Sequence, residues 1–247
     1  MWRLCGECEV KKCVSTLSPN KKYICDEVHV HKMKQYQRKE IAFERVLFFS
    51  DAVVAIAITL LALDLRLQLP GAHQMVFKDL LLPWRNYVAF VLSFINVAAF
   101  WRTHHDFFIY IHKMDDRMMV FNICWLFCIV TLPFCTSLVS THFGDSPAIF
   151  LYCLNVFLIS IFQNSIWDYA DGKEGFLNRE NLHPDYNKRI KLIVNLDMVN
   201  GAVALIVSFF YPRAAFFLLF FKLPAFLYAA FYMGRKRRDL RRNSQVN

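Results

Sequence analysis

Residues 45–67 read RVLFFSDAVVAIAITLLALDLRL, an apolar run that holds a carboxylate, Asp51, within its first two turns. From residue 46 onward the run matches the ~20 residues with which an α-helix crosses a hydrocarbon core of about 30 Å. It is too long for a barrel strand, which needs only about 9–11 residues. Because lipid offers no partners to backbone polar groups, the run predicts a membrane-spanning helix.

Further apolar windows of similar length follow at residues 83–103, 118–140, 147–167, 192–211 and 213–233. Hydrophobic residues make up 56% of the 247-residue chain, above the ordinary ~45–50%. Of the 29 Lys and Arg and the 20 Asp and Glu, only eight fall inside the windows. We therefore expect an all-α membrane protein with six transmembrane helices, and a water-soluble globule is the least favoured class.

The formal net charge of +9 is distributed as membrane topology requires. Lys and Arg are dense before the first window, between the second and third, between the fourth and fifth, and after the sixth, and they are sparse elsewhere. The positive-inside rule then places both termini and the 104–117 and 168–191 loops in the cytosol. We expect a multi-pass protein of the plasma membrane, surrounded by membrane lipid, with no nucleic-acid partner.

Three regions follow from this pattern: residues 1–40 as a cytosolic extension for which disorder is one interpretation, 41–233 as the six-span domain, and 234–247 as a basic tail. A cluster of potential metal ligands lies in the extension: Cys5, Cys8, Cys13, Cys25, His29 and His31. Zinc is its functional interpretation, but the spacing after Cys8 fits no standard finger. No metal site is assigned.

Asp51 needs a partner, because a charge at the start of a membrane span is costly unless it meets protein or water. Arg45 lies six residues away, which is 240° around a straight helix, so the two do not share a face. The second span ends, and the third begins, with polar and aromatic residues: Trp101, Arg102, Thr103, His104, His105, Asp106 and Asn122. We expect Asp51 to bond to this group, so that the network locks the cytosolic ends of three helices together.

An aliphatic stripe follows the same helix. Leu60 and Leu63 fall within about 40° of Ile56, whereas Thr59 lies about 60° to one side and Asp51 about 140° away. By spacing alone, such a stripe faces lipid or a packing surface. If copies of the helix surround an axis, the stripe forms stacked apolar rings that gate ions by dewetting, with the Thr59 hydroxyl as the nearest polar group.

Two blocks of the sequence resemble the transmembrane protein 175 family of potassium channels. Residues 45–51 match its R-x-x-x-F-S-D signature, followed by A-I-A-I-T-L-L. The second block consists of Trp101, His104, His105, Phe107, Asp115, Asn122, the run Leu132-Pro133-Phe134, and Thr136. The resemblance covers roughly residues 41–233 and is strongest up to residue 140.

The resemblance implies a potassium-selective or potassium-preferring channel that lacks the T-V-G-Y-G filter. By position, the family's apolar constriction falls on Ile56, its threonine on Thr59, and further pore-facing residues on Leu60 and Leu63. The resemblance implies a structural network built from Arg45, Phe49, Ser50, Asp51, Trp101, His104, His105 and Asn122. A single six-span repeat implies a homotetramer in which the first helix lines a central pore.

Two other classes stay open. A membrane-bound metal or haem enzyme would use cytosolic-side residues, among them His104, His105, Asp106, His112 and Asp115; His105 and His112, seven apart, would share a helical face. No H-E-x-x-H or Gly-rich phosphate loop accompanies them, so we expect no cofactor and no enzyme activity. A secondary transporter would use helices broken inside the membrane, for which Pro133 and Pro224 give slight support. Lys222, in the sixth window, is interpreted as a snorkelling or paired amine.

Overall fold

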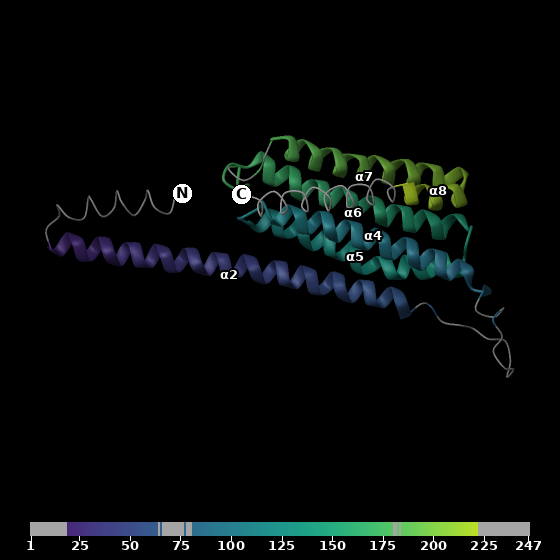
Figure 1. The fold of residues 1–247 in the computed structure, drawn as a ribbon, viewed down its shortest axis with the longest axis horizontal. Helices are drawn as coiled ribbons and strands as arrows, with labels where there is room; N and C mark the ends of the chain where they lie inside the picture. The colour runs from purple at the N-terminus through teal and green to yellow at the C-terminus, as the bar shows by residue number, and fades with distance from the viewer. Residues whose placement is uncertain are drawn as a thin grey trace, which may run out of the picture. The chain divides into compact units, whose positions relative to one another are not determined.

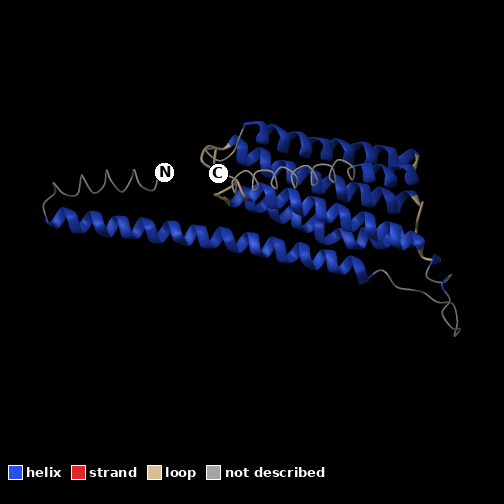
Figure 2. Ribbon diagram, in the orientation of Figure 1, coloured by secondary structure: helices blue, strands red, loops and turns tan. Residues whose placement is uncertain are grey.

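The computed structural model describes residues 19–63, 81–179 and 184–221, together with the single positions Leu65, Phe77 and Leu182. Its elements are α2 (Pro19–Leu63), α4 (Trp84–Phe108), α5 (Asp116–Thr141), α6 (Ser146–Gly172), α7 (Pro184–Phe210), α8 (Pro212–Leu218) and the 3₁₀ helix η1 (Leu219–Phe221). Every named element is a helix (Figure 2), which confirms the all-α prediction. Lys222, Pro224, the basic tail, and the extension up to residue 18 with Cys5, Cys8 and Cys13 lie outside the described residues.

Four of the described helices are long and apolar enough to cross a membrane, namely α2 from Met33 onward, α5, α6 and α7. The second predicted span coincides with α4, which is long enough but carries Arg85, Asn86, Asn96 and Arg102 among its apolar residues. The sixth window begins in α8 and η1 and continues past the described residues. The fold is therefore that of a multi-helix membrane protein.

The chain divides into two units, residues 1–48 and 49–247. The helix α2 belongs to both, because it runs from Pro19 to Leu63 without interruption. Residues 19–40, which the sequence analysis assigned to an extension, are thus helical, and the helix begins well before the apolar run. It ends at Leu63, and Leu65 is not helical.

Within the second unit, α4, α5, α6 and α7 run side by side as a bundle (Figure 1). Gly144 turns the chain between α5 and α6 at a φ of 100°, a conformation that side chains with a Cβ rarely adopt. The helices α6 and α7 approach closely: a Cβ at Gly201 would lie 3.1 Å from the Cα of Phe157. Such small-residue contacts are typical of helix packing in membranes, where dispersion and close fit replace the hydrophobic effect.

Asp115 ties the loop after α4 to the end of α6. Its side chain caps α5 by accepting from the backbone N–H of Met118 at 3.0 Å. It also accepts from the Tyr169 hydroxyl at 2.5 Å and from Lys173 Nζ at 2.7 Å. Burial on its own would raise the pKa of Asp115, but the hydrogen bonds from Lys173, Tyr169 and Met118 outweigh it and lower the pKa to about 2. The ionised carboxylate is therefore the form that holds these elements together.

This pKa gives the stability a definite acid dependence. Because the folded-state pKa of Asp115 is depressed, its contribution is present above the unfolded pKa of about 4 and is lost as pH falls toward about 2. The Lys173 side chain is 46% exposed, so solvent screening reduces this contribution to about 1 kcal/mol. We expect Asp115→Asn to lower the melting temperature in detergent at pH 7 and to flatten its decline between pH 4 and pH 2, as followed by circular dichroism. Asp116→Asn, at an exposed neighbouring carboxylate, is the control. An unchanged acid profile in Asp115→Asn would contradict the role of the ion pair.

Candidate functional site

One edge of α2, within the second unit, is buried against the bundle. Ser50, Val54, Ala57 and Leu61 are at most 2% exposed. Their spacings of four, three and four residues put them on one face of a helix. The sequence folds this way because the face carries small and aliphatic side chains that fit between neighbouring helices.

Another edge of α2, about 120° away, is uncovered in the subunit. Phe49 is 59% exposed, Ile56 59%, Leu60 40% and Leu63 60%. Phe49, Ile56 and Leu63 are seven residues apart and so form a nearly straight stripe. Thr59 is also exposed, and its hydroxyl donates to the Ile56 carbonyl at 2.7 Å. Because this bond uses the hydroxyl proton, the Thr59 oxygen can still accept a hydrogen bond or coordinate a cation through its lone pairs.

Asn122 of α5 joins α2 to α4 through a buried hydrogen-bond chain. Its Nδ2 donates to Ser50 Oγ at 2.9 Å, and its Oδ1 lies 2.8 Å from His104 Nε2. Since Oδ1 accepts only, Nε2 carries the ring proton. The His104 ring is 2% exposed and stacks on Trp125, with centroids 4.2 Å apart and planes 12° apart. The chain thus links three helices without a formal charge.

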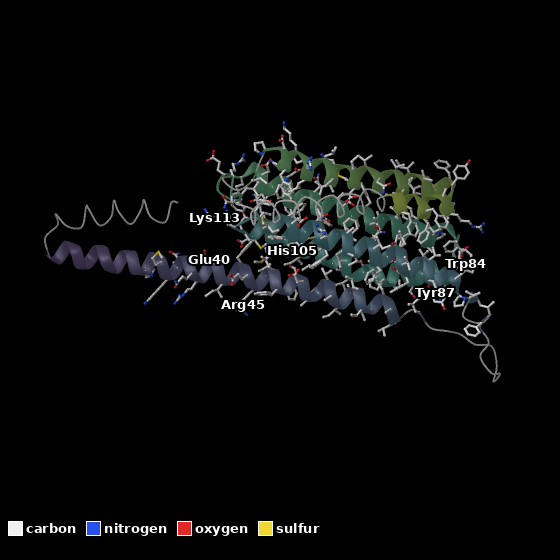
Figure 3. The ribbon with its side chains drawn as sticks, viewed as in Figure 1. Glu40, Arg45, Trp84, Tyr87, His105 and Lys113 are labelled. Carbon is white, nitrogen blue, oxygen red and sulfur yellow. The ribbon has the colours of Figure 1, made fainter. Side chains whose placement is uncertain are left out.

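A second hydrogen bond holds Asp51, the residue that follows Ser50. Trp101 Nε1 of α4 donates to Asp51 Oδ1 at 2.9 Å. The indole of Trp101 also stacks on the ring of His105, which is labelled in Figure 3, with centroids 5.6 Å apart. Ser50 and Asp51 are about 100° apart around the helix and bind to α5 and α4, respectively. Two bonds in different directions fix the rotation of α2 about its own axis, and with it the direction of the uncovered edge.

Not every predicted network residue joins this arrangement. Arg45 belongs to the first unit and is exposed. Phe49 lies on the uncovered apolar edge and not among the polar groups. His105 contributes a ring contact, and Arg102 pairs within its own helix with Asp106 at 3.5 Å. The network described by the structure consists of Ser50, Asp51, Trp101, His104 and Asn122.

The sequence analysis missed a second buried polar cluster in the middle of the bundle. The Tyr152 hydroxyl lies 3.0 Å from Ser93 Oγ and accepts from Asn96 Nδ2 at 3.2 Å. Thr136 donates to Ser93 at 2.7 Å. The signal was present, because Ser93, Asn96 and Thr136 are polar residues inside apolar windows. Their hydrogen bonds join α4, α5 and α6 and leave these side chains no evident role beyond holding the bundle together.

The arrangement on which the enzyme alternative relied is not formed. The helix α4 ends at Phe108, so His105 and His112 do not share a helical face. The backbone N–H of His112 instead donates to the Phe176 carbonyl at 3.0 Å, in a short pairing of two loops. In the described ranges, no three His, Cys, Asp or Glu side chains are placed to hold a metal ion.

This fold and its anchored apolar helix define a class of helical membrane proteins, and known sequences resemble part of the chain. A family model described as the endosomal/lysosomal potassium channel TMEM175 matches residues 45–133. A potassium channel of Streptomyces collinus is 33% identical over 104 residues, which are 42% of this chain and 50% of the relative. The endosomal/lysosomal proton channel TMEM175 of Gallus gallus is 35% identical over 161 residues, covering 60% of this chain but 31% of that protein.

A solved structure agrees with these sequence matches. The lysosomal potassium-selective channel TMEM175 homologue from Chamaesiphon minutus superposes with a TM-score of 0.64 and 25% identity, covering 75% of this chain and 96% of the other. The chain is thus similar to TMEM175 channels in the sequence of residues 45–133 and, over most of its length, in fold. The chain spans half or less of the length of the Streptomyces and Gallus relatives.

The Asn122 chain gives a direct test of the anchor. Asn122→Leu removes both side-chain hydrogen bonds and leaves the buried His104 Nε2 and Ser50 Oγ without them. We expect a loss of about 1–3 kcal/mol in stability, measured as a lower denaturation midpoint in detergent. Ile123→Leu, at the exposed next position, is the matched control and should change the midpoint little. Equal midpoints for Asn122→Leu and the control would contradict the anchoring role.

Proposed function

We propose that the chain is a subunit of a cation channel that conducts potassium along an axis surrounded by copies of α2. The observation that carries the proposal is the fixed rotation of α2, which presents Ile56, Leu60 and Leu63 together on an edge that the subunit leaves uncovered. The Streptomyces relative and the Chamaesiphon homologue are named as potassium channels, which supports the choice of ion.

The composition of this uncovered surface favours contact with copies over contact with lipid. Between its branched side chains, α2 exposes small ones at Ala52, Ala55 and Thr59. Small residues let helix backbones approach closely, as association within a membrane requires. The outward face of α7, in contrast, is lined with bulky apolar side chains, which suit lipid: Leu192, Leu196, Val199, Ile206 and Phe209.

Four copies would complete the pore. One repeat supplies one such helix, and a closed ring of identical subunits needs a cyclic axis, for which a homotetramer is the proposed assembly. Both termini are proposed to lie in the cytosol and the protein in the plasma membrane, on the charge pattern of the loops.

The mechanism needs no chemical step. Potassium would move down its electrochemical gradient, and in the closed state a ring of Ile56 side chains would exclude water from the axis. Opening would tilt or rotate α2 enough to wet this ring. Partial dehydration at the short constriction, assisted by the Thr59 oxygens, would favour potassium over sodium, whose hydration shell is held more tightly.

The proposed gate can be tested by flux in liposomes under a potassium gradient, with sodium as the competing ion. Ile56→Asn places a polar ring where dewetting closes the axis, so we expect a higher leak. Thr59→Ala removes the nearest side-chain oxygen, so we expect a weaker potassium preference. Ile123→Asn makes the same polar change on an exposed face of α5 and serves as the control. If both α2 variants keep the flux and reversal potential of the wild type, these residues do not line the pore.

Asp51 is assigned a bracing role, separate from ion selection. Asp51→Ala removes the acceptor of the Trp101 indole and frees the rotation of α2. We expect the yield of tetramer in detergent gel filtration to fall several-fold. This is the change that a loss of about 1–2 kcal/mol in the free energy of association implies. Asp168→Ala, at an exposed acid of α6, is the control. A stable Asp51→Ala tetramer with altered selectivity would contradict the bracing role and place this carboxylate in the ion path.

A further inference from the structure

The helix α5 exposes a row of bulky apolar side chains. Phe127 is 68% exposed and Phe134 61%, and Ile123 and Val130 are exposed on the same side. These four residues fall within about 60° of one another around the helix. We call them the outer face of α5. Its centre lies about 110° from Asn122, the residue through which α5 binds Ser50 of α2.

The helix α2 has an open side of the opposite character, beside the edge that carries Ile56. Ala52, Ala55 and Ala62 are exposed there. They lie about 40–120° from Ile56 around the helix, in the direction away from Ser50. We call these three residues the alanine side of α2. A surface of small side chains lets another helix approach closely.

The two anchor bonds and the hand of the α-helix decide which part of an adjacent copy this side meets. Viewed from the N-terminal end, successive residues of a right-handed helix follow one another clockwise. With Ile56 directed toward the axis, Ser50 and its partner α5 lie about 120° clockwise, and Asp51 and its partner α4 about 140° anticlockwise. The alanine side is also anticlockwise. It therefore lies on the flank of the subunit opposite to α5, and opposite flanks of adjacent copies meet around a cyclic axis.

The outer face of α5 is turned toward that adjacent copy. His104 lies within hydrogen-bond distance of Asn122, and Thr136 donates to Ser93, so α4 runs antiparallel to α5. Because consecutive membrane spans alternate in direction, α2 runs parallel to α5. Seen from the same end, the outer face is therefore about 110° clockwise from the bond to α2, which directs it away from its own subunit and toward the next one.

The heights of the two surfaces along the axis also agree. The bond between Ser50 and Asn122 puts these residues at one height. Phe127 follows Asn122 by five residues, and Ala55 follows Ser50 by five. Since both helices rise by about 1.5 Å per residue, Phe127 and Ala55 lie at the same height, and a rotation about the axis preserves it.

We propose that the outer face of α5 binds the alanine side of α2 in a second copy of this chain, with Phe127 on Ala55 and Phe134 on Ala62. The second pair follows the same offset, because both residues come seven positions after the first pair. The inference rests on the proposed function, in which copies of α2 surround an axis. The contact is heterologous and closes the ring, so the Ile56 edge of each copy faces the axis only with the next copy in place.

The match of size and height favours a second copy over lipid as the occupant of this face. Lipid chains cover an apolar surface of any shape, and require neither large side chains at one height nor small ones at the same height on the opposite flank. Helices in membranes associate through close packing, to which a large side chain beside a small one contributes. Aromatic side chains such as Phe127 and Phe134 bury the largest areas in such contacts.

Disulfide cross-linking of the full chain in membranes tests the contact. We expect Ala55→Cys/Phe127→Cys to give a ladder of dimer, trimer and tetramer on non-reducing gels after oxidation, because the two thiols come from different copies. Each single variant, in the same background of native cysteines, sets the baseline. Ala55→Cys/Val199→Cys pairs the same position with an exposed residue of α7 and should stay at this baseline.

An exchange of side-chain sizes gives a second readout that needs no native-cysteine control. Ala55→Phe brings two aromatic side chains together, and Phe127→Ala leaves the contact unfilled, so each should lower the yield of tetramer in detergent gel filtration several-fold. Ala55→Phe/Phe127→Ala restores one large and one small side chain and should recover most of the yield. Two losses that merely add in the double variant would overturn the pairing.

The outcomes separate this interface from the channel proposal. A wild-type tetramer in which the Ala55–Phe127 pair stays at the single-variant baseline would overturn the interface and leave the channel standing. A ladder that stops at the dimer would also overturn it, because a heterologous contact does not close with two copies. The full ladder in a protein without potassium flux would support the interface and contradict the channel. A wild-type chain that is monomeric in membranes would overturn both.

Discussion

The rotation of α2 is fixed by two hydrogen bonds to consecutive residues, and the proposed pore depends on it. Ser50 binds Asn122 of α5, and Asp51 binds Trp101 of α4. One bond alone would let the helix swing about the contact, but two bonds about 100° apart around the axis hold it. A rotation of one residue position would replace Ile56 on the uncovered edge with Ala55 or Ala57 and would bring aliphatic side chains out of the buried face.

The anchor is stable because its buried members satisfy one another. In a low-dielectric interior an unpaired polar atom costs more than a hydrogen bond returns, so a half-formed network would weaken the bundle. Asn122 uses its donor toward Ser50 and its acceptor toward His104, and the histidine ring is covered by Trp125. Asp51 lies half-buried at the edge of the group, and its carboxylate accepts the hydrogen bond of the Trp101 indole.

Much of the fold and of the anchor of α2 could be predicted from the sequence. The features that could not be predicted have physical causes. The apolar windows predicted the helices because membrane spans require length and hydrophobicity. Asp51 indicated the anchor, since an acid in a span needs a partner. Helical spacing did not reveal that Phe49 would be uncovered, because the choice between two faces depends on which neighbours pack there. The break of α4 at Phe108, which separates His105 from His112, depends on a pairing of two loops far apart in sequence.

The distance between anchor and stripe bears on how such a helix could open. Ile56 follows Asp51 by five residues, about 7.5 Å along the axis, whereas Leu63 follows by twelve, about 18 Å. A helix held at Ser50 and Asp51 and tilted as a rigid rod moves its far end more than twice as far as the position of Ile56. The same tilt therefore displaces Leu63 by more than twice the distance that it displaces Ile56. In the proposed channel, a tight constriction would be most stable near the anchor, where displacement is smallest, and the wider parts of the passage would lie toward Leu63.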